Sequence, residues 1–302
     1  MRHVELAWDI SHLTPSSAPA TLTGSLFAPD TAFTSGQPVN LLVCLHGGSC
    51  SRQYYHPTYL DHSYSFARFM TDRHYLILAL DNLGMGNSSR PEPEKHLSLD
   101  MIAAANDFAT RQTAAALLDG EWLDMSAHSA LSISGLGHSM GGMLGVYQQG
   151  RFQSFERLIV AGWSNLPLEL GDTDAANLRA SLAQGGYIPT DRQSLHSLFH
   201  MPDVPVDVIA ADNQNASLTP VTLALAALTP GIVVREAAAI SCPLLLLYGE
   251  LDVSPDMQRE PTFYPKASSR ALKRIGQAAH MHNLASSRLT AWQSIDEWLR
   301  EH

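Results

Sequence analysis

Residues 137–141 of this 302-residue chain have the sequence Gly-His-Ser-Met-Gly, which matches the pattern G-x-S-x-G. The pentapeptide follows an apolar strand candidate, Leu131 to Gly135, and precedes a predicted helix that begins near Met140. Glycines two residues before and two residues after Ser139 allow a strained turn without side-chain collisions. Such a turn would lift the hydroxyl to a helix N-terminus, where backbone N–H groups favour developing negative charge. This context favours a nucleophile elbow over the alternative, a glycine-rich turn without chemistry.

Strand and helix candidates alternate along the chain on both sides of this turn. The strand candidates are His3 to Ile10, Thr21 to Phe27, Leu41 to Leu45, Tyr75 to Leu80, Leu131 to Gly135, Arg157 to Gly162 and Pro243 to Tyr248. The helix candidates lie around Phe66, Phe69 and Met70, from the N-cap Ser98 to near Gly120, from about Met140, and along a final stripe of Leu289, Trp292, Ile295 and Leu299. Most of these strands are apolar enough to be buried on both faces. The pattern predicts an α/β fold, with a mostly parallel central sheet flanked by helices.

One interval is too long for this alternation. From Trp163 to Cys242 there are 80 residues between two strands, whereas a whole βαβ unit takes roughly 30 or more. The interval contains Leu- and Ala-rich helical pieces at Ala175 to Leu182, Arg192 to Phe199 and Pro220 to Leu228. We therefore predict a helical cap at residues 165–236, inserted into a core of residues 1–164 and 237–302. A cap over the carboxyl edge of the sheet would enclose a pocket, because ligands bind at that edge.

Four further segments extend the pattern around Ser139. They are His46-Gly47-Gly48, Asp81-Asn82-Leu83-Gly84-Met85-Gly86-Asn87-Ser88, Gly249-Glu250-Leu251-Asp252 and Gly276-Gln277-Ala278-Ala279-His280-Met281. Together with residues 137–141, they resemble the α/β-hydrolase superfamily over nearly the whole chain. In that family the corresponding segments carry an oxyanion-hole loop, a loop after the fourth strand, the catalytic acid and the catalytic histidine. One departure is mild: the family usually has glycine directly before the histidine, where this chain has Ala279.

The resemblance implies a catalytic triad of Ser139, Asp252 and His280, in the chain order of the family. The acid lies 113 residues after the serine, which leaves room for a cap, and the histidine lies 28 residues after the acid, which fits one helix and one strand. His280 would deprotonate Ser139, so activity should rise with pH as the histidine loses its proton. An oxyanion hole would use backbone N–H groups of Met140 and of the loop after His46, where we expect Gly48.

Alternatives to two of these assignments stay open at this point. Glu250 and Asp256 are alternative acids close to Asp252, and Glu169 is a more distant one, because some family members place the acid on that earlier strand. His282 is an alternative base. We also expect His282, Ser49 and His138 to lie near the substrate pocket, and His46 to brace the oxyanion loop.

Sequence patterns for cofactors and metals point to none. His280-x-His282 lacks a third ligand nearby, and the zinc motif HExxH is absent. The glycine-rich loops match neither the P-loop nor the dinucleotide-binding pattern. We therefore expect a hydrolase without a cofactor.

Composition restricts the partners. Lys and Arg total 19 against 29 Asp and Glu, a formal net charge of −10, which disfavours a nucleic-acid groove. Apolar runs are far shorter than the ~20 residues of a membrane-spanning helix, and the first residues do not resemble a secretory signal. The odd cysteine count of three argues against a disulfide framework and for a reducing compartment, so we expect a cytoplasmic protein. A homodimer is compatible with the sequence, but nothing in it argues for one.

These observations predict a serine hydrolase that cleaves a carboxylic ester or lactone, with an apolar pocket under the cap. The alternatives are a C–C bond hydrolase acting on an activated ketone, and a thioesterase, amidase or acyltransferase. A further alternative is a ligand receptor on the same fold that does not turn its ligand over. A serine at position 139 excludes the haloalkane dehalogenase and epoxide hydrolase branches, which need a carboxylate there.

Overall fold

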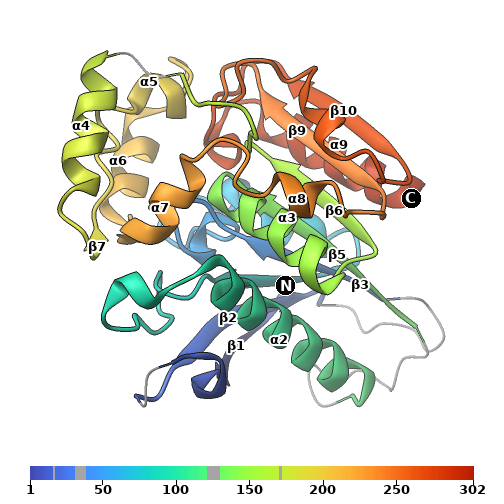
Figure 1. The fold of residues 1–302 in the computed structure, drawn as a ribbon. Coiled ribbons are helices and arrows are strands. Elements are labelled where there is room, and N and C mark those ends of the chain that lie inside the picture. The colour runs from blue at the N-terminus through green and yellow to red at the C-terminus, as the bar shows by residue number, and fades with distance from the viewer. Residues whose placement is uncertain (16–17, 31–38, 121–129, 170–171) are drawn as a thin grey trace.

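The central element of the fold is a mostly parallel β-sheet, drawn in Figure 1. The computed structural model describes residues 1–15, 18–30, 39–120, 130–169 and 172–302. In this part of the chain, eight strands form one sheet in the order β1-β2-β4-β3-β5-β6-β9-β10. They are β1 (Arg2–Asp9), β2 (Thr21–Ala28), β3 (Val39–Leu45), β4 (Tyr75–Asp81), β5 (Leu131–His138), β6 (Arg157–Ala161), β9 (Leu244–Gly249) and β10 (Arg270–Ile275). Strand β2 pairs antiparallel with β1 and β4, and the other neighbours pair parallel. The predicted fold class is confirmed.

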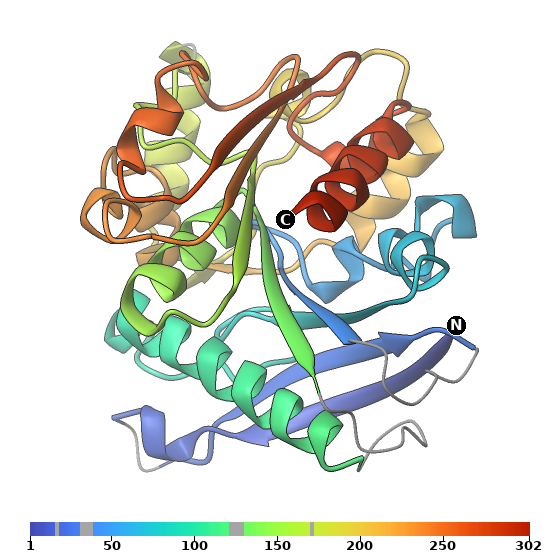
Figure 2. The same cartoon turned by 90° about the vertical axis from the view of Figure 1, so that its right-hand side faces the viewer.

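Helices cover both faces of the sheet. Because successive side chains of a strand point to opposite sides, each strand contributes to both apolar clusters. In β3, Leu41, Val43 and Leu45 join one apolar cluster, whereas Leu42 and Cys44 join the other. The first cluster is completed by α2 (Leu99–Leu118) and α3 (Met140–Phe152), and the second by α1 (Phe66–Thr71) and α9 (Arg288–Glu301). Figure 2 shows α2 and α3 on one side of the sheet and α9 on the other. The uniformly apolar strands of the sequence reflect this double coverage.

The four helices predicted around Phe66, after Ser98, from Met140 and along the C-terminal stripe are all present, as α1, α2, α3 and α9. Ser98 is the N-cap of α2, where its hydroxyl accepts the N–H of Met101 at 3.2 Å. Along α9, Trp292, Ile295 and Leu299 are buried as predicted, but Leu289 is 49% exposed. At 3.6 residues per turn, Leu289 points about 120° away from Ile295, so the buried face of α9 does not include Leu289.

Residues 165–236, predicted as the cap and called the cap segment below, leave the sheet after β6 and return before β9. Apart from residues 170–171, which lie outside the described part, the segment contains α4 (Asp172–Leu182), β7 (Tyr187–Ile188), α5 (His196–Phe199), α6 (Val206–Gln214), β8 (Thr219–Pro220), α7 (Val221–Ala227) and α8 (Val234–Ala237). In Figure 1 the helices α4 to α7 gather at one side of the sheet. The segment is helical, and β7 pairs with β8 to form a small antiparallel sheet.

Two predicted helices are shorter than expected. Of the helical piece expected over Arg192 to Phe199, α5 covers the last four residues, and Asp191 accepts the N–H groups of Gln193 and Ser194 in the turn before it. The helix expected between Asp252 and His280 is only a 3-10 turn at Glu260–Phe263, although the strand expected there is present as β10. Helix α6 was not predicted from the sequence.

Candidate active site

Ser139 lies in a strained turn between β5 and α3. Its φ of 54° and ψ of −125° are rare for a residue with a side chain, and it is the N-cap of α3. The flanking glycines are required by close backbone contacts. A Cβ at Gly137 would come within 2.1 Å of the Gly141 carbonyl oxygen, and one at Gly141 within 2.1 Å of the Leu45 oxygen. The turn therefore has the geometry that the G-x-S-x-G pattern predicts.

The structure brings the three predicted triad residues together. His280 Nε2 lies 2.8 Å from Ser139 Oγ, and His280 Nδ1 lies 2.7 Å from Asp252 Oδ1. Asp252 and His280 are buried, and Ser139 is partly exposed. The alternative acid Glu250 instead accepts the backbone N–H of Gln277 and pairs with Arg274 near the surface. Among the described residues, Asp252 is the carboxylate that contacts His280.

Asp252 is surrounded by donors. The N–H groups of Gly249 and Val253 each donate to its carboxylate at 2.8 Å. His282 binds the second oxygen, Oδ2, through Nε2 at 2.7 Å. Burial by itself would raise the pKa of Asp252, but the neighbouring His282 and His280 hold the pKa well below its usual range. The acid is therefore ionised at neutral pH.

The other predicted pocket residues separate into two groups. Ser49 and His138 line the cleft in front of Ser139, whereas His282 lies behind Asp252 and does not line it. His138 Nε2 donates to the carbonyl oxygen of His280 at 2.7 Å, and its ring stacks on Tyr54 at a centroid distance of 4.6 Å. Burial, together with His280 and His282 nearby, holds the pKa of His138 well below the usual range. A neutral His138 thus supports the backbone of the loop that carries His280.

Gly48 and Met140 lie next to each other at the cleft. A Cβ at Gly48 would be 3.9 Å from the Met140 side chain, and both residues line the cleft with Ser139. Met140 is the first residue of α3, so its N–H has no acceptor within the helix. In the described part of the chain, no protein acceptor takes the N–H of Gly48. These two N–H groups are available to a substrate oxygen.

His46 braces the loop that carries Gly48. Its Nδ1 donates to the Gly47 oxygen at 2.9 Å, and its Nε2 accepts the Asn82 N–H at 3.2 Å. The Asn82 side chain in turn donates to the His46 oxygen at 3.1 Å. Burial lowers the pKa of His46, which keeps the ring neutral and able to accept from Asn82.

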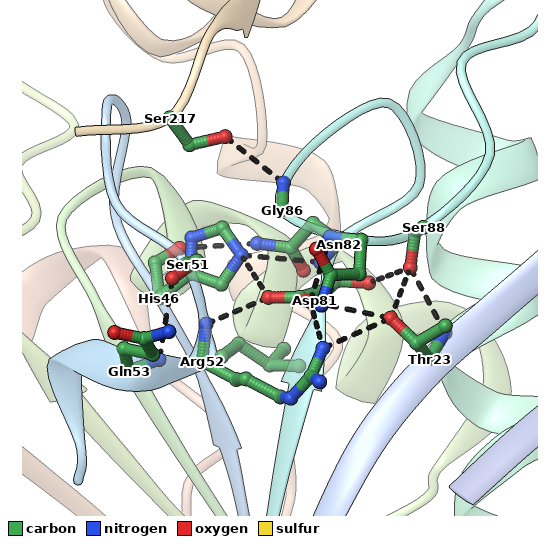
Figure 3. A network of polar contacts seen from close by, with 12 residues as sticks. Thr23, His46, Ser51, Arg52, Gln53, Asp81, Asn82, Gly86, Ser88 and Ser217 are labelled. Atoms are coloured by element: carbon green, nitrogen blue, oxygen red, sulfur yellow. Dashed lines mark hydrogen bonds and ion pairs between the residues drawn. The ribbon is translucent and has the colours of Figure 1, made fainter. Parts of the chain in front are cut away.

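A buried carboxylate, Asp81, holds the far end of the same loop (Figure 3). Its Oδ1 accepts the backbone N–H of Arg52 at 2.7 Å, and its Oδ2 forms an ion pair with the Arg52 guanidinium. Oδ2 also accepts the N–H of Asn87 at 2.9 Å and the Thr23 hydroxyl at 3.2 Å. The Asp81–Ser88 segment therefore shapes loops beside the site and does not contact the triad.

The cleft in front of Ser139 has a volume of about 1030 Å³, part of it open to solvent. Core loops form its floor, and the cap segment contributes apolar side chains: Leu166, Leu168, Leu178, Leu195, Leu198, Phe199, Ala224, Ala227, Leu228 and Pro230. Among the described residues, no Asp, Glu, Lys or Arg lines the cleft. Its lining is therefore apolar and, apart from the histidines, uncharged.

Sequence analysis missed residues that support the histidine loop. Tyr54 accepts two contacts from Asn283, the N–H at 3.2 Å and the side-chain amide at 3.0 Å. The carbonyl oxygens of Leu198 and Phe199 in α5 accept the N–H groups of His280 and Met281, each at 3.0 Å. Tyr54 and Asn283 are 229 positions apart, so no local pattern could reveal the contact.

The described residues contain no helix that is both long and apolar enough to cross a bilayer. They also contain no group of three or more His, Cys, Asp or Glu residues that could hold a metal ion.

A parallel sheet that presents a strained serine to a histidine and a buried carboxylate defines the class of α/β hydrolases. The model of the alpha/beta hydrolase family matches residues 42–291, so the chain belongs to this family. A search of curated proteins finds no match.

Solved structures of the same fold are similar to the chain over nearly all of its length. A thermophilic esterase from Thermogutta terrifontis is 18% identical, with a TM-score of 0.62 and coverage of 100% of this chain and 99% of that chain. The enol-lactonase from Burkholderia xenovorans LB400 is 14% identical, with a TM-score of 0.61 and coverage of 93% and 97%. The proline iminopeptidase of Mycobacterium smegmatis is 17% identical, with a TM-score of 0.61 and coverage of 94% and 95%. At these identities the likeness concerns the fold.

Proposed function

We propose that this protein is a serine hydrolase that cleaves a carboxylic ester or lactone of a neutral, apolar small molecule. The observation that carries the proposal is the continuous hydrogen-bonded series from Ser139 Oγ through His280 to Asp252, with distances of 2.8 and 2.7 Å. A serine hydroxyl is a weak nucleophile until a base removes its proton, and this series supplies the base and its orienting acid. The triad roles, the oxyanion hole and the cap function are all part of the proposal.

In the acylation step, Ser139 Oγ attacks the substrate carbonyl carbon while its proton moves to His280 Nε2. The carbonyl oxygen becomes an oxyanion that accepts the N–H groups of Gly48 and Met140. When the tetrahedral intermediate collapses, the bond to the alcohol oxygen breaks, and that oxygen takes the proton from His280. An acyl-enzyme on Ser139 remains, tethered to the alcohol if the substrate is a lactone.

Deacylation repeats the chemistry with water. His280 removes a proton from water, the hydroxide oxygen attacks the acyl carbon, and the same two N–H groups bind the oxyanion. Collapse breaks the bond to Ser139 Oγ, which recovers its proton from His280. Throughout, Asp252 stabilises the imidazolium without taking its proton.

The cleft supports the substrate class. Its lining has no Asp, Glu, Lys or Arg among the described residues, so a charged acyl or alcohol group would lose hydration without gaining a partner. Aliphatic side chains of the cap segment would instead gain from contact with an apolar group. Small-molecule sites commonly combine such a lining with a few polar groups at the reacting centre.

The test compares wild type with Ser139→Ala on aryl esters of increasing chain length, small and macrocyclic lactones, a thioester and a β-diketone. Ser134→Ala, the same change in strand β5 before the elbow and away from the cleft, is the matched control. We expect wild type and Ser134→Ala to cleave uncharged esters or lactones, and Ser139→Ala to be inactive. A fluorophosphonate probe should label the first two proteins and spare the third.

Two outcomes would overturn the proposal. Cleavage of the diketone alone would make the protein a C–C bond hydrolase. No turnover and no fluorophosphonate labelling of wild type would leave a ligand receptor as the better interpretation.

A further inference from the structure

Arg192 of the cap segment reaches into the core and binds the loop that carries Gly48. Its side chain is buried, with 5% exposure. Nε donates to the Ser49 hydroxyl and Nη2 to the Ser49 carbonyl oxygen, both at 2.9 Å. Nη2 also lies 3.4 Å from the sulfur of Cys50. One guanidinium thus holds the residue that directly follows Gly48.

The orientation of this guanidinium is fixed from the opposite side. Its Nη1 forms an ion pair with Asp212 of α6, which is also 5% exposed. Tyr59 of the core donates its hydroxyl to the other oxygen of Asp212 at 2.7 Å. Because Asp212 occupies Nη1, the remaining edge of the planar group is directed at Ser49.

Ser49 needs such support because its backbone is strained. Its φ is 56°, in the left-handed region that residues with a side chain rarely adopt. Its N–H donates to Thr219 Oγ1 at 2.8 Å, and its carbonyl oxygen accepts the Ser217 N–H at 2.9 Å. With the Arg192 contacts, each polar group of Ser49 is bound by the cap segment. This arrangement leaves the N–H of Gly48 free beside Met140.

We propose that Arg192 is a positioning residue for the oxyanion hole, acting through Ser49. It does not line the cleft, so it has no direct contact with a substrate there. The inference rests on the proposed function, because an oxyanion hole matters only if an acyl group is transferred. It adds to that function the idea that the cap segment contributes to the rate of chemistry as well as to substrate preference.

The experiment uses variants that avoid an unpaired buried charge, because removing one partner of such a pair is strongly destabilising. Arg192→Met/Asp212→Asn removes the contacts to Ser49 and both charges together, and wild type is its reference. Arg192→Lys keeps a charge beside Asp212, but an ammonium lacks the planar fork that binds both oxygens of Ser49. Tyr187→Phe is the matched control, because it removes a different cap-to-core bond, from the Tyr187 hydroxyl to the Pro91 oxygen at 2.7 Å.

The readouts are kcat and KM for the best ester or lactone, and the inhibition constant of an aryl trifluoromethyl ketone. Ser139 adds to that ketone, its proton passes to His280, and the resulting hemiketal oxyanion occupies the same hole. We expect the double variant to lose about 10- to 100-fold in kcat relative to wild type, within the loss expected when an oxyanion donor is weakened. KM should change less than about 3-fold, and ketone binding should weaken by the same factor as kcat. Arg192→Lys should lose about 10-fold in kcat, and Tyr187→Phe should match wild type.

A double variant with wild-type kcat would overturn the inference, as would a folded Arg192→Lys variant with wild-type kcat. A rise in KM without a fall in kcat would also overturn it, as would an equal fall in kcat for Tyr187→Phe, since either result would indicate a general effect on the cap. If the double variant does not fold, Arg192→Lys decides the matter. Each of these results is distinct from failure of the proposed function, which Ser139→Ala alone tests.

Discussion

His282 donates from Nε2 to Oδ2 of Asp252 at 2.7 Å, on the carboxylate oxygen that does not contact His280 Nδ1. One carboxylate therefore joins two imidazoles two positions apart in the chain. Of these two imidazoles, His280 is the one that also contacts Ser139, at 2.8 Å. His282 is placed to limit rotation of the acid.

Replacing His282 should slow the reaction without abolishing it. Hydrogen bonds to charged groups are worth about 1.5–3 kcal/mol, and Asp252 would keep its other donors, so we expect His282→Ala to lower kcat about 10-fold. His282→Gln, which can place an amide N–H near Oδ2, should recover part of the loss. Steady-state kinetics with the exposed His62→Ala as control would measure this. Unchanged kcat in His282→Ala would contradict it.

Asp252 and Glu250 offer a comparison of two carboxylates in one turn. Asp252→Asn removes the charge that stabilises the imidazolium, and we expect kcat to fall about 1000- to 10,000-fold. Glu250→Gln should keep wild-type activity, since Glu250 is exposed and contacts Gln277 and Arg274 instead. Measuring kcat/KM for both variants tests the assignment. A larger loss in Glu250→Gln would refute it.

A charge placed in the apolar cleft should weaken activity on a long-chain ester. Leu228 lines the cleft, whereas Leu225, in helix α7, is 48% exposed and does not line it. Leu228→Lys should lower kcat/KM for a long-chain ester at least about 10-fold, because the ammonium must lose hydration against the acyl chain. Leu225→Lys should have no effect. Equal values for the two variants would show that the acyl group binds elsewhere.

Stability should fall as the pH drops from about 6.5 towards 4. Burial lowers the pKa of His56 and of His200 to about 4, and it also lowers the pKa of His46 and His138. In this window the unfolded chain binds protons that the folded protein excludes, so stability is complete above the unfolded pKa and is lost as the pH falls. Calorimetric melting from pH 4.5 to 8 would show the slope.

Replacing one buried histidine tests whether these groups cause the pH dependence of stability. His200→Gln removes one such group and should make the pH dependence shallower, whereas the exposed His62→Gln should leave it unchanged. A melting temperature that stays constant from pH 8 to 4.5 would contradict the prediction.

The central sheet was predictable because its signal is local. Strands such as Leu244–Gly249 are covered on both faces, so their apolar runs are visible without knowing the partners. The elbow was predictable because its glycines form a short pattern around Ser139. A Cβ at Gly137 would meet the Gly141 carbonyl oxygen of the same turn, although one at Gly141 would meet the Leu45 oxygen of β3. Local demands of this kind leave a pattern within a few residues.

Other parts of the site depend on contacts between distant residues. Arg192 and Ser49 are 143 positions apart, and no local sequence pattern around either residue indicates the contact. Helix α6 is only nine residues long and begins directly after Pro205, so its periodicity did not stand out in the sequence. Leu289 continues the α9 pattern in sequence, but its direction on the helix exposes it. Such features are decided by tertiary packing.

The backbone bonds from His280 and Met281 to the carbonyl oxygens of α5 have a consequence for protein engineering and for the divergence of this family. A cap that only covered the cleft could be exchanged between relatives without affecting the core. Here, exchanging residues 165–236 would remove the carbonyl oxygens that accept the N–H groups of His280 and Met281. A chimera with a foreign insertion would therefore need compatible carbonyl positions, and selection for a new substrate would have to preserve them.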